Sequence, residues 1–423
     1  MSNQINSTLG DLVKAGGGII HTGPFGSQLH AEDYVAQGIP CIMPANMKDN
    51  RVDLSNIAYI SDEDAQRLSK YLVKAGDIVY SRRGNVTLKA LIRKNEAGYF
   101  CGTGCLLLRP GNLLDSDYLT YYLSTPKIQS WLISQAIGAT MPNLNTGILA
   151  RIPFSGPEKS IQEKISSVLR AIDDKLELNN RINAELEAMA KTLYDYWFVQ
   201  FDFPDANGKP YKTSGGKMEF NATLKRDIPA GWRASNILSL ADLFGGGTPT
   251  KTNHEYWDGS IPFFTPTDSD KNIYSLNTQD SITELGLKNS STRLFEKNTI
   301  FITARGSVGR LALNAVPMAM NQSCYALRAK QGTSFAFLYF LTKELIHHLE
   351  VKATGSVFNS IVSNDIEYTN LALPDDIGLI DKYAKKTEVA FTKIELLTKE
   401  NQQLIKLRDW LLPLVMNGQV TIK

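Results

Sequence analysis

Apolar residues follow two different spacings along this chain. In residues 1–156 and again in 204–374, short β-branched and aromatic runs are separated by Gly, Pro, Asn and Ser turns, as in GIPCIMPANM, AGDIVYSRRGN and GTGCLLLRPG. Such runs predict short strands. Each stretch continues into a helical pattern, DSDYLTYYLSTPKIQSWLISQ in one and TSFAFLYFLTKELIHHLEVKA in the other. We therefore expect two globules of the α+β class.

Two longer segments carry apolar residues at alternating spacings of three and four. The seam positions of the first are Ile165, Val168, Ile172, Asn179, Ile182, Leu186, Met189, Leu193 and Tyr196, and those of the second are Ile380, Tyr383, Thr387, Ala390, Ile394, Leu397, Asn401, Leu404 and Leu411. Lys175 and Arg408 are the polar exceptions, with Leu176 beside the first. Heptads sustained over several repeats predict coiled-coil helices.

Each predicted seam contains one central asparagine, Asn179 or Asn401. A buried asparagine at a seam position lowers stability and fixes the register of the two helices. The alternative is an asparagine that tilts out to solvent, and the sequence favours neither.

The chain is an internal repeat. Ile78 to Gly84 in IVYSRRGN matches Ile300 to Gly306 in IFITARGS, 222 positions later, and IPCIMP matches IPFFTP at the same offset. Later the offset falls to 217, where Gly138 matches Gly355 and Pro157 matches Pro374. A constant offset across separate motifs is poorly explained by chance similarity, so we interpret the chain as two copies of one unit.

The repeat predicts the domain organisation. We expect a first globule in residues 1–156, a central helix in 157–203, a second globule in 204–374 and a C-terminal helix in 375–423. The two helices, each of about 40 residues, can pair antiparallel as a rod of roughly 60 Å, with a rise of about 1.5 Å per residue. This arrangement has an internal pseudo-two-fold axis.

Composition is that of a globular protein. The chain has 423 residues, 43% apolar and 21% charged, with a net charge of only +2, so a basic binding face must be sought locally. No signal peptide is indicated, the most apolar window is too short to cross a bilayer, and we expect a cytoplasmic location. Four cysteines favour reduced core thiols, with a zinc site as the alternative.

Catalytic motifs are missing from the sequence. GGGTPTKT has the wrong spacing for a phosphate-binding loop, and GTG alone does not predict a dinucleotide site. The chain has no G-x-S-x-G or H-E-x-x-H motif and no motif typical of adenine methyltransferases. The acidic pair at Asp173 and Asp174 falls on a predicted coiled-coil helix, where a solvated face is the simpler interpretation.

Polar side chains at turns are the remaining candidates for function. They are Ser27, Gln28, Asn46, Lys48, Arg82, Arg83, Asn85 and Lys89 in the first copy, and Thr250, Lys251, Thr267, Asp268, Arg305, Ser307, Arg310, Asn321 and Gln322 in the second. Arg and Lys bind guanine edges, Asn and Gln bind adenine, and hydroxyls and lysines reach phosphates. A solvated turn explains any single residue, whereas binding explains the two matching sets.

Several stretches resemble the specificity subunit of type I restriction–modification enzymes. They are TGPFGSQLHAEDY with GIPCIMP, GDIVYSRRG, the IGATMPNLN…IPF segment before a coiled coil, and the link from Trp197 to Trp232. The likeness covers essentially the whole chain. Each motif is loose, and their order, repeated twice, is specific.

The resemblance implies two target recognition domains, each reading one half of a split double-stranded DNA site. It implies helices that space the halves and dock two methyltransferase subunits, joined by restriction subunits with ATP-driven motors in a prokaryotic cell. S-adenosylmethionine, ATP and magnesium would belong to those partners, and this chain would be non-catalytic. The second copy has one turn arginine instead of two and lacks the Gly76–Asp77 pair, so the site should be asymmetric.

Two other functions compete with this interpretation. A fused restriction–modification enzyme would need catalytic motifs that the chain lacks. A two-headed protein-binding scaffold on a coiled-coil stalk would need no DNA contact. The turn arginines also have two possible roles, since Arg82, Arg83 and Arg305 could pair with nearby carboxylates and brace the turn instead of binding DNA.

Overall fold

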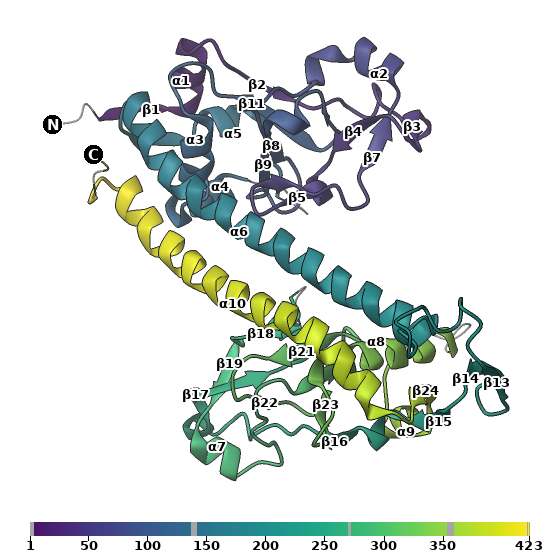
Figure 1. Cartoon of the computed structure of the whole chain (residues 1–423). Helices are drawn as coiled ribbons and strands as arrows, with labels where there is room; N and C mark the ends of the chain where they lie inside the picture. The colour runs from purple at the N-terminus through teal and green to yellow at the C-terminus, as the bar shows by residue number, and fades with distance from the viewer. Residues whose placement is uncertain (1–3, 137–141, 270–271, 353–358, 421, 423) are drawn as a thin grey trace. The chain divides into compact units, whose positions relative to one another are not determined.

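The computed structural model describes residues 4–136, 142–269, 272–352, 359–420 and 422. The chain forms two compact units (Figure 1): unit 1 is Met1–Lys175 with Leu404–Lys423, and unit 2 is Leu176–Gln403. Each long helix is shared between the units, so the predicted domain limits remain predictions. Gly138 and Gly355, which anchored the later part of the repeat, lie outside the described residues.

Unit 1 is a globule of small sheets and short helices. Its strands are β1 (Ile5–Thr8), β2 (Ile19–Thr22), β3 (Tyr34–Val35), β4 (Ile39–Ile42), β5 (Met47–Lys48), β6 (Arg51–Val52), β7 (Ala58–Ile60), β8 (Ile78–Ser81), β9 (Lys89–Leu91), β10 (Phe100–Cys101), β11 (Cys105–Arg109) and β12 (Pro153–Gly156). Its short helices are α1 (Leu9–Ala15), α2 (Asp62–Arg67), α3 (Ser116–Tyr122), α4 (Pro126–Gln135) and α5 (Thr146–Ala150). The larger sheets run β2-β11-β8-β9 and β10-β4-β7-β3.

The sheet β2-β11-β8-β9 is covered on both faces. Ile78 and Tyr80 of β8 pack into one hydrophobic cluster, with the helices α3 to α5, whereas the intervening Val79 packs into another, with β4 and β10. Successive strand residues point to opposite faces of a sheet. A sheet that packs against an apolar layer on each face therefore needs strands in which every residue is apolar. This explains why apolar and polar residues do not alternate in IVYS and CLLLR.

Unit 2 repeats this plan. Its strands are β13 (Met218–Asn221), β14 (Arg226–Pro229), β15 (Trp232–Asn236), β16 (Ala241–Gly245), β17 (Trp257–Phe264), β18 (Tyr274–Ser275), β19 (Asp280–Ile282), β20 (Ile300–Thr303), β21 (Leu311–Asn314), β22 (Ala319–Met320), β23 (Cys324–Ala329) and β24 (Asn370–Pro374). Its short helices are α7 (Glu284–Lys288), α8 (Phe335–Lys352) and α9 (Ser363–Tyr368). The order β16-β23-β20-β21 corresponds to β2-β11-β8-β9.

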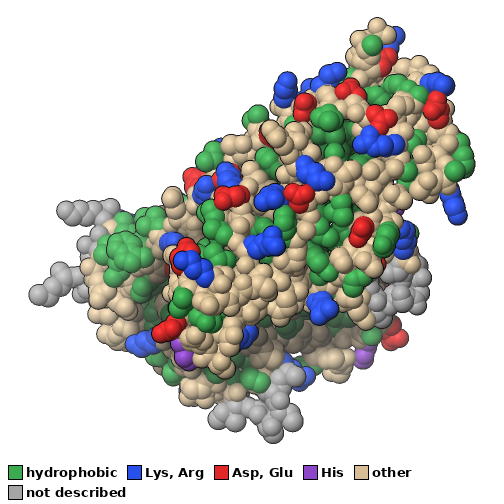
Figure 2. Space-filling model, turned by 90° about the horizontal axis from the view of Figure 1, so that it is seen from below, with side chains coloured by type: hydrophobic (Ala, Val, Ile, Leu, Met, Phe, Trp, Pro, Cys, Tyr) green, Lys and Arg blue, Asp and Glu red, His purple; other side chains and the backbone are tan. Residues whose placement is uncertain are grey.

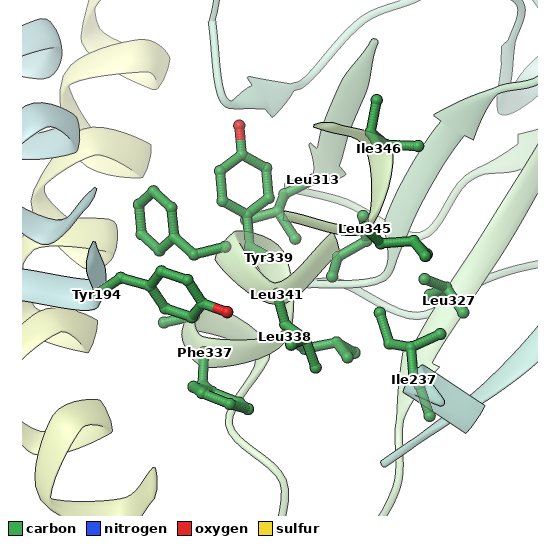
Figure 3. Packing of buried hydrophobic residues seen from close by; sticks show 14 of the residues in the cluster. Tyr194, Ile237, Leu313, Leu327, Phe337, Leu338, Tyr339, Leu341, Leu345 and Ile346 are labelled. Atoms are coloured by element: carbon green, nitrogen blue, oxygen red, sulfur yellow. The ribbon is translucent and has the colours of Figure 1, made fainter. Parts of the chain in front are cut away.

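The largest core of unit 2 lies around α8. Figure 3 shows Phe337, Leu338 and Leu341 packed among residues of the sheet and of the neighbouring long helix. Tyr194 is fully buried there and donates a hydrogen bond from its hydroxyl to Glu344 at 2.7 Å. The opposite face of the sheet packs through Phe301, so this sheet is also buried on both sides.

The two long helices, α6 (Lys159–Tyr194) and α10 (Ile377–Met416), pair antiparallel. In unit 2, Asn179 donates to Asn401 at 2.8 Å, and Tyr383 donates to the Ala190 carbonyl at 2.9 Å. Residue numbers rise along α6 as their partners' numbers fall along α10. In unit 1, Arg408 of α10 pairs with Asp173 of α6 at 3.1 Å. The predicted coiled-coil pairing is confirmed.

The seam of α6 differs from the prediction near its end. Met189 is 68% exposed and Tyr196 is also exposed, whereas Ala190, Tyr194 and Trp197 are buried. An undistorted helix has 3.6 residues per turn, so a strict 3.5-residue seam drifts off the contact face over several turns. Tyr196 and Trp197 lie in the π-helical turn Asp195–Val199 that follows α6, and this turn shifts the contact face further. The predicted seam of α10 is buried or half-buried throughout.

The repeat extends to strand pairing. β4 pairs parallel with β10 and antiparallel with β7, and β17 pairs parallel with β22 and antiparallel with β19. β1 pairs with β12 in unit 1 as β15 pairs with β24 in unit 2. Among the described residues, no helix has the length and apolarity needed to cross a membrane.

Candidate nucleic-acid interface

In each unit, two loops emerge at one edge of the doubly covered sheet. β2 and β8 both pair antiparallel with β11, and β16 and β20 both pair antiparallel with β23. Strands that flank a common antiparallel neighbour run in the same direction, so their carboxyl ends share an edge. The loops after β2 and β8, and those after β16 and β20, therefore lie next to each other.

The turn after β8 is held by backbone hydrogen bonds. The Arg82 amide donates to the Gly104 carbonyl, and the Leu144 amide donates to the Arg82 carbonyl, both at 2.8 Å. Arg83 forms an isolated antiparallel bridge with Asn143. Gly84 has a φ of 74°, a left-handed conformation that favours glycine. The segment before α5, which contains Asn143 and Leu144, is thus hydrogen-bonded to the turn and fixes it in place.

The turn after β20 is built in the same way. The Ala304 amide donates to the Ser323 carbonyl at 2.8 Å, and the Ile361 amide donates to the Ala304 carbonyl at 3.0 Å. Arg305 forms an isolated bridge with Ser360. Gly306 has a φ of 63°, and the following Ser307, at 43°, adopts a conformation that is uncommon for a residue with a side chain.

The turn arginines are available to a partner. Arg83 and Arg305 are exposed, and Arg82 is half-buried. Within the described ranges, none of these three guanidinium groups forms an ion pair with a carboxylate. Bracing by carboxylates, the alternative that the sequence left open, has no support among the described side chains. The backbone bonds supply the bracing instead.

The structure sorts the other candidate residues by exposure. Exposed are Ser27, Lys48, Asn85, Thr250, Lys251, Thr267, Ser307, Arg310 and Gln322, and half-buried are Gln28, Asp268 and Asn321. Asn46 and Lys89 are buried. Most of the set is therefore accessible to a ligand.

Burial requires two corrections to the candidate set. The Asn46 side chain accepts from the Met43 amide at 3.1 Å and donates to the Asp53 carbonyl at 3.3 Å, so it closes its own turn. The Lys89 ammonium donates to Ser124 at 2.7 Å inside unit 1, and burial lowers its pKa to about 7. Neither side chain is presented to a ligand, because each is committed to internal bonds.

Asp268 and Gln28 brace loops. Asp268, the counterpart of Asn46, accepts from the Thr265 amide and the Gln279 amide, both at 2.8 Å. The Gln28 side-chain oxygen accepts from the Phe25 amide at 3.3 Å and from the Tyr71 hydroxyl at 2.9 Å. In unit 2, Thr248 donates to the Gln322 side chain. These bonds hold the loops in place beside the arginine turns.

The sequence analysis missed two features of this edge. Phe25, in the loop after β2, is 52% exposed, and the Arg82 guanidinium carbon lies 5.6 Å from its ring centroid. Asn143 and Ser360 lie against the two arginine turns. Phe25 is apolar and was therefore not among the polar candidates, although the stretch TGPFGS places a large apolar residue between glycines. The matching MPNLN and FNSI segments were a usable signal for the second feature.

Charge and thiols add little to the site. On the face shown in Figure 2, Lys and Arg are interspersed with Asp and Glu, in keeping with the net charge of +2. All four cysteines are buried and free, and burial raises the pKa of the Cys41 thiol to about 12. In the part of the chain that the structure describes, no group of three or more His, Cys, Asp or Glu side chains is arranged to hold a metal ion.

A family model described as type I restriction modification DNA specificity domain matches the chain twice, at residues 4–188 and 229–405. The chain is 24% identical over 430 residues to the type I restriction enzyme HindI specificity subunit of Haemophilus influenzae, and the match covers 89% of this chain and 92% of the relative. It is 25% identical to the MjaIX specificity subunit of Methanocaldococcus jannaschii, covering 93% of this chain and 89% of the relative.

A solved structure has a similar fold. The crystal structure of the type I restriction–modification S subunit from M. genitalium superposes with a TM-score of 0.60 at 18% identity. The superposition covers 98% of this chain and 96% of that one. At this identity the likeness concerns the fold alone.

Proposed function

Since the chain belongs to the family of type I restriction–modification DNA specificity domains, we propose that each of its two recognition domains reads one half of a bipartite, asymmetric double-stranded DNA site. The arginine turn carries this proposal. It is built twice with the same backbone bonds, at Arg82 to Asn85 and at Ala304 to Ser307. Guanidinium groups on a rigid backbone suit bidentate contacts with guanine in the major groove.

The two half-sites differ because the two turns differ. Unit 1 presents Arg82 and Arg83, whereas unit 2 presents Arg305, followed by Ser307. A bidentate arginine–guanine contact contributes about 1–3 kcal/mol of discrimination against a wrong base. A one-arginine turn and a two-arginine turn therefore select different bases, and the whole site has no two-fold symmetry.

The long helices serve the methyltransferase subunits in this proposal. Exposed apolar side chains on the helix surfaces include Leu178, Met189, Val389, Leu396, Leu407 and Trp410. Exposed apolar side chains of this kind are available to pack against a partner chain. Leu169 and Leu176 of α6 are 0% and 9% exposed, so they belong to the interior and not to this surface.

The proposal assigns no chemistry to this chain. It binds DNA and positions two methyltransferase subunits, and restriction subunits join that core. S-adenosylmethionine, ATP and magnesium act in those partners. The helices set the distance between the half-sites, so lengthening both by four residues, about 6 Å of helix, should widen the unread gap by one or two base pairs in the methylated motif. An unchanged gap would argue against the spacing role.

Methylation by the assembled complex tests the proposal. The chain and the methyltransferase subunit, alone and together, are offered a random-sequence DNA library, and methylated positions are sequenced. We expect a bipartite motif only when both chains are present, with DNA binding that weakens as salt rises. Methylation of the same site by the partner alone would refute the proposal. A protein-binding scaffold would show no salt-sensitive DNA binding.

Docking has a separate test on α10. Val389 and Leu396 are 72% and 57% exposed, so replacing both by Asp should leave unit 2 folded. We expect the Asp variant to lose co-elution with the methyltransferase subunit. The matched replacements Val389→Ile and Leu396→Met keep an apolar surface and should retain it. Co-elution of both variants would place the docking surface elsewhere.

A further inference from the structure

Unit 1 contains an aromatic–arginine pair at its recognition edge. The Phe25 ring, 52% exposed, faces the Arg82 guanidinium, whose carbon lies 5.6 Å from the ring centroid. This distance is within the range of a cation–π contact. The Arg82 Nε is buried and has no hydrogen-bond partner among the described residues. The ring and the guanidinium group are thus in cation–π contact.

The loop that carries Phe25 is braced rather than loose. The Gln28 and Leu29 amides donate to the Phe25 carbonyl at 2.8 and 3.3 Å. Arg67 donates through two guanidinium nitrogens to the Gln28 carbonyl, each at 3.2 Å. Holding a phenylalanine ring in water is unfavourable, since about half of its apolar surface stays hydrated. A braced loop with an exposed ring is the arrangement expected of a contact residue.

Unit 2 lacks both members of the pair. The Gly23 amide donates to the Cys105 carbonyl at 2.9 Å and the Gly246 amide to the Cys324 carbonyl at 3.3 Å. These equivalent bonds place Thr248 where unit 1 has Phe25. The equivalent of Arg82 is Ala304, which is 4% exposed. The aromatic ring and the first arginine are therefore present together in one unit and absent together in the other.

The backbone of unit 2 also excludes a bulkier loop. A Cβ on Gly247 would lie 2.1 Å from the Ser291 hydroxyl and 2.6 Å from the Thr292 amide nitrogen. The loop after β16 must therefore keep glycine where unit 1 has Pro24. Unit 2 cannot adopt the loop of unit 1 by side-chain substitution alone.

We propose that Arg82 and Phe25 together read two adjacent base pairs of the half-site bound by unit 1, a guanine through Arg82 and a thymine C5-methyl group through Phe25. This inference rests on the proposed function. The C5-methyl of thymine is the apolar feature of the major groove, and phenylalanine is among the side chains that contact it. The two groups lie 5.6 Å apart, which is less than two base-pair steps of about 3.4 Å each, so both can reach adjacent base pairs.

The experiment removes the methyl group from the DNA instead of from the protein. The full complex with its methyltransferase subunits methylates substrates in which each thymine of the first half-site is replaced in turn by deoxyuridine. At one position we expect a loss of about fourfold in methylation efficiency, the value of one buried methyl group. Phe25→Ala should lose about fourfold on the thymine substrate and be insensitive to deoxyuridine at that position.

Arg82 variants locate the neighbouring base. Arg82→Ala should relax selection of a guanine next to that thymine by roughly 5- to 150-fold. Arg82→Lys keeps the charge and loses the bidentate fork, so it should relax the same position and retain overall affinity. Thermal unfolding is recorded for every variant, and the second half-site serves as the internal control.

Three results would overturn the inference. One is deoxyuridine having no effect at any position, as expected for a ring inserted from the minor groove. Another is a combined loss: the Phe25→Ala variant on the deoxyuridine substrate would lose the product of the two single effects instead of the same fourfold as either alone. The third is a Phe25 or Arg82 variant altering both halves equally. Failure of the proposed function is distinct from these, because the unmodified complex would then show no bipartite motif.

Discussion

Units 1 and 2 share a scaffold and differ in what it presents. The turns after β8 and β20 use equivalent backbone hydrogen bonds, equivalent bridges and a left-handed glycine, Gly84 or Gly306. Their side chains differ at the first arginine position, where unit 2 has Ala304. The bonds that fix the turn come from the backbone and from the hydroxyls of Ser81 and Thr303, which donate to the Arg83 and Ser307 carbonyls, so the arginine side chains are free to vary without loss of the turn. A repeated fold with two specificities follows from this division.

The same comparison holds inside the sheets. Lys89 of β9 and Leu311 of β21 occupy equivalent positions, because Ile78 pairs with Leu91 as Ile300 pairs with Leu313. Lys89 is 3% exposed, and unit 1 accommodates its ammonium with one hydroxyl partner, Ser124. The interior of unit 1 is thus more polar at this point than that of unit 2.

The largest expected effect concerns the helices that cover the sheets. Phe337 lies three residues after the capping Ser334, and Tyr118 three after the capping Asp115; both are fully buried. Replacing either by Ala should cost about 3–5 kcal/mol and destabilise mainly its own unit. Hydrogen exchange by mass spectrometry locates the loss.

Tyr118→Phe is the matched control for these core changes. The Tyr118 hydroxyl is buried and has no hydrogen-bond partner among the described residues. Removing it should leave stability unchanged or raise it, since an unsatisfied buried hydroxyl is unfavourable. A loss as large as that of Tyr118→Ala would mean that the hydroxyl has an important partner.

The second prediction separates the two recognition edges. Arg83→Ala should relax bases in one half-site only and Arg305→Ala in the other, each by about 1–3 kcal/mol of discrimination. The readout is methylation of a library in which each half is randomised in turn. A uniform loss on all sequences with a shallower salt slope would indicate phosphate contacts instead. If one variant relaxed base selection in both half-sites, the two units would not each read a separate half-site.

The sequence predicted the scaffold better than the site. The repeat and the heptads identified two related globules and an antiparallel helix pair, because the spacing of apolar residues follows the period of the strand or helix that buries them. The apolar pattern could not show that β9 is buried in the core of unit 1, so Lys89 was wrongly placed among the exposed candidates. A polar residue at a strand end looks the same in the sequence whether the sheet is covered on one face or two. Phe25 was missed because the candidate set contained polar side chains alone, and because its loop is braced by Arg67, which lies 39 residues beyond Gln28.

The third prediction concerns the centre of the helix pair, where equivalent asparagines meet. Asn179 and Asn401 are 0% and 8% exposed, and Asn179 donates to Asn401 at 2.8 Å. Asn401→Leu leaves a buried amide without this partner and should cost about 1–3 kcal/mol. Asn179→Leu should cost a similar amount.

The double variant completes this cycle. Leucine at both positions should restore or exceed the original stability, because a matched apolar pair replaces a polar one. The register of the helix pair, which is one of the two roles that the sequence left open for these asparagines, should then be less well fixed. Hydrogen exchange along α6 and α10 should become faster. Additive losses in the urea unfolding of the four proteins would show that the two amides do not act as a pair.

The last prediction is a pH dependence confined to unit 1. Burial lowers the pKa of Lys89 to about 7, below the value near 10.4 of an unfolded chain. Between these values the unfolded state binds more protons, so stability rises with pH above 7, by at most about 1.4 kcal/mol per pH unit. Below pH 7 the lysine is charged in both states and contributes no slope.

Lys89→Leu introduces the residue that unit 2 carries at this position and should remove that slope. The Ser124 hydroxyl loses the lysine but still donates to the Thr120 carbonyl, so this loss is small and the same at every pH. Urea unfolding at pH 6, 7, 8 and 9 measures the difference between the two proteins. We expect the variant's relative advantage to be largest at pH 6 and to shrink above pH 7. Leu311→Met is the control in unit 2 and should run parallel to the unmodified protein. Parallel curves for Lys89→Leu as well would show that the ammonium is solvated in the folded state, and the polarity contrast between the two interiors would disappear.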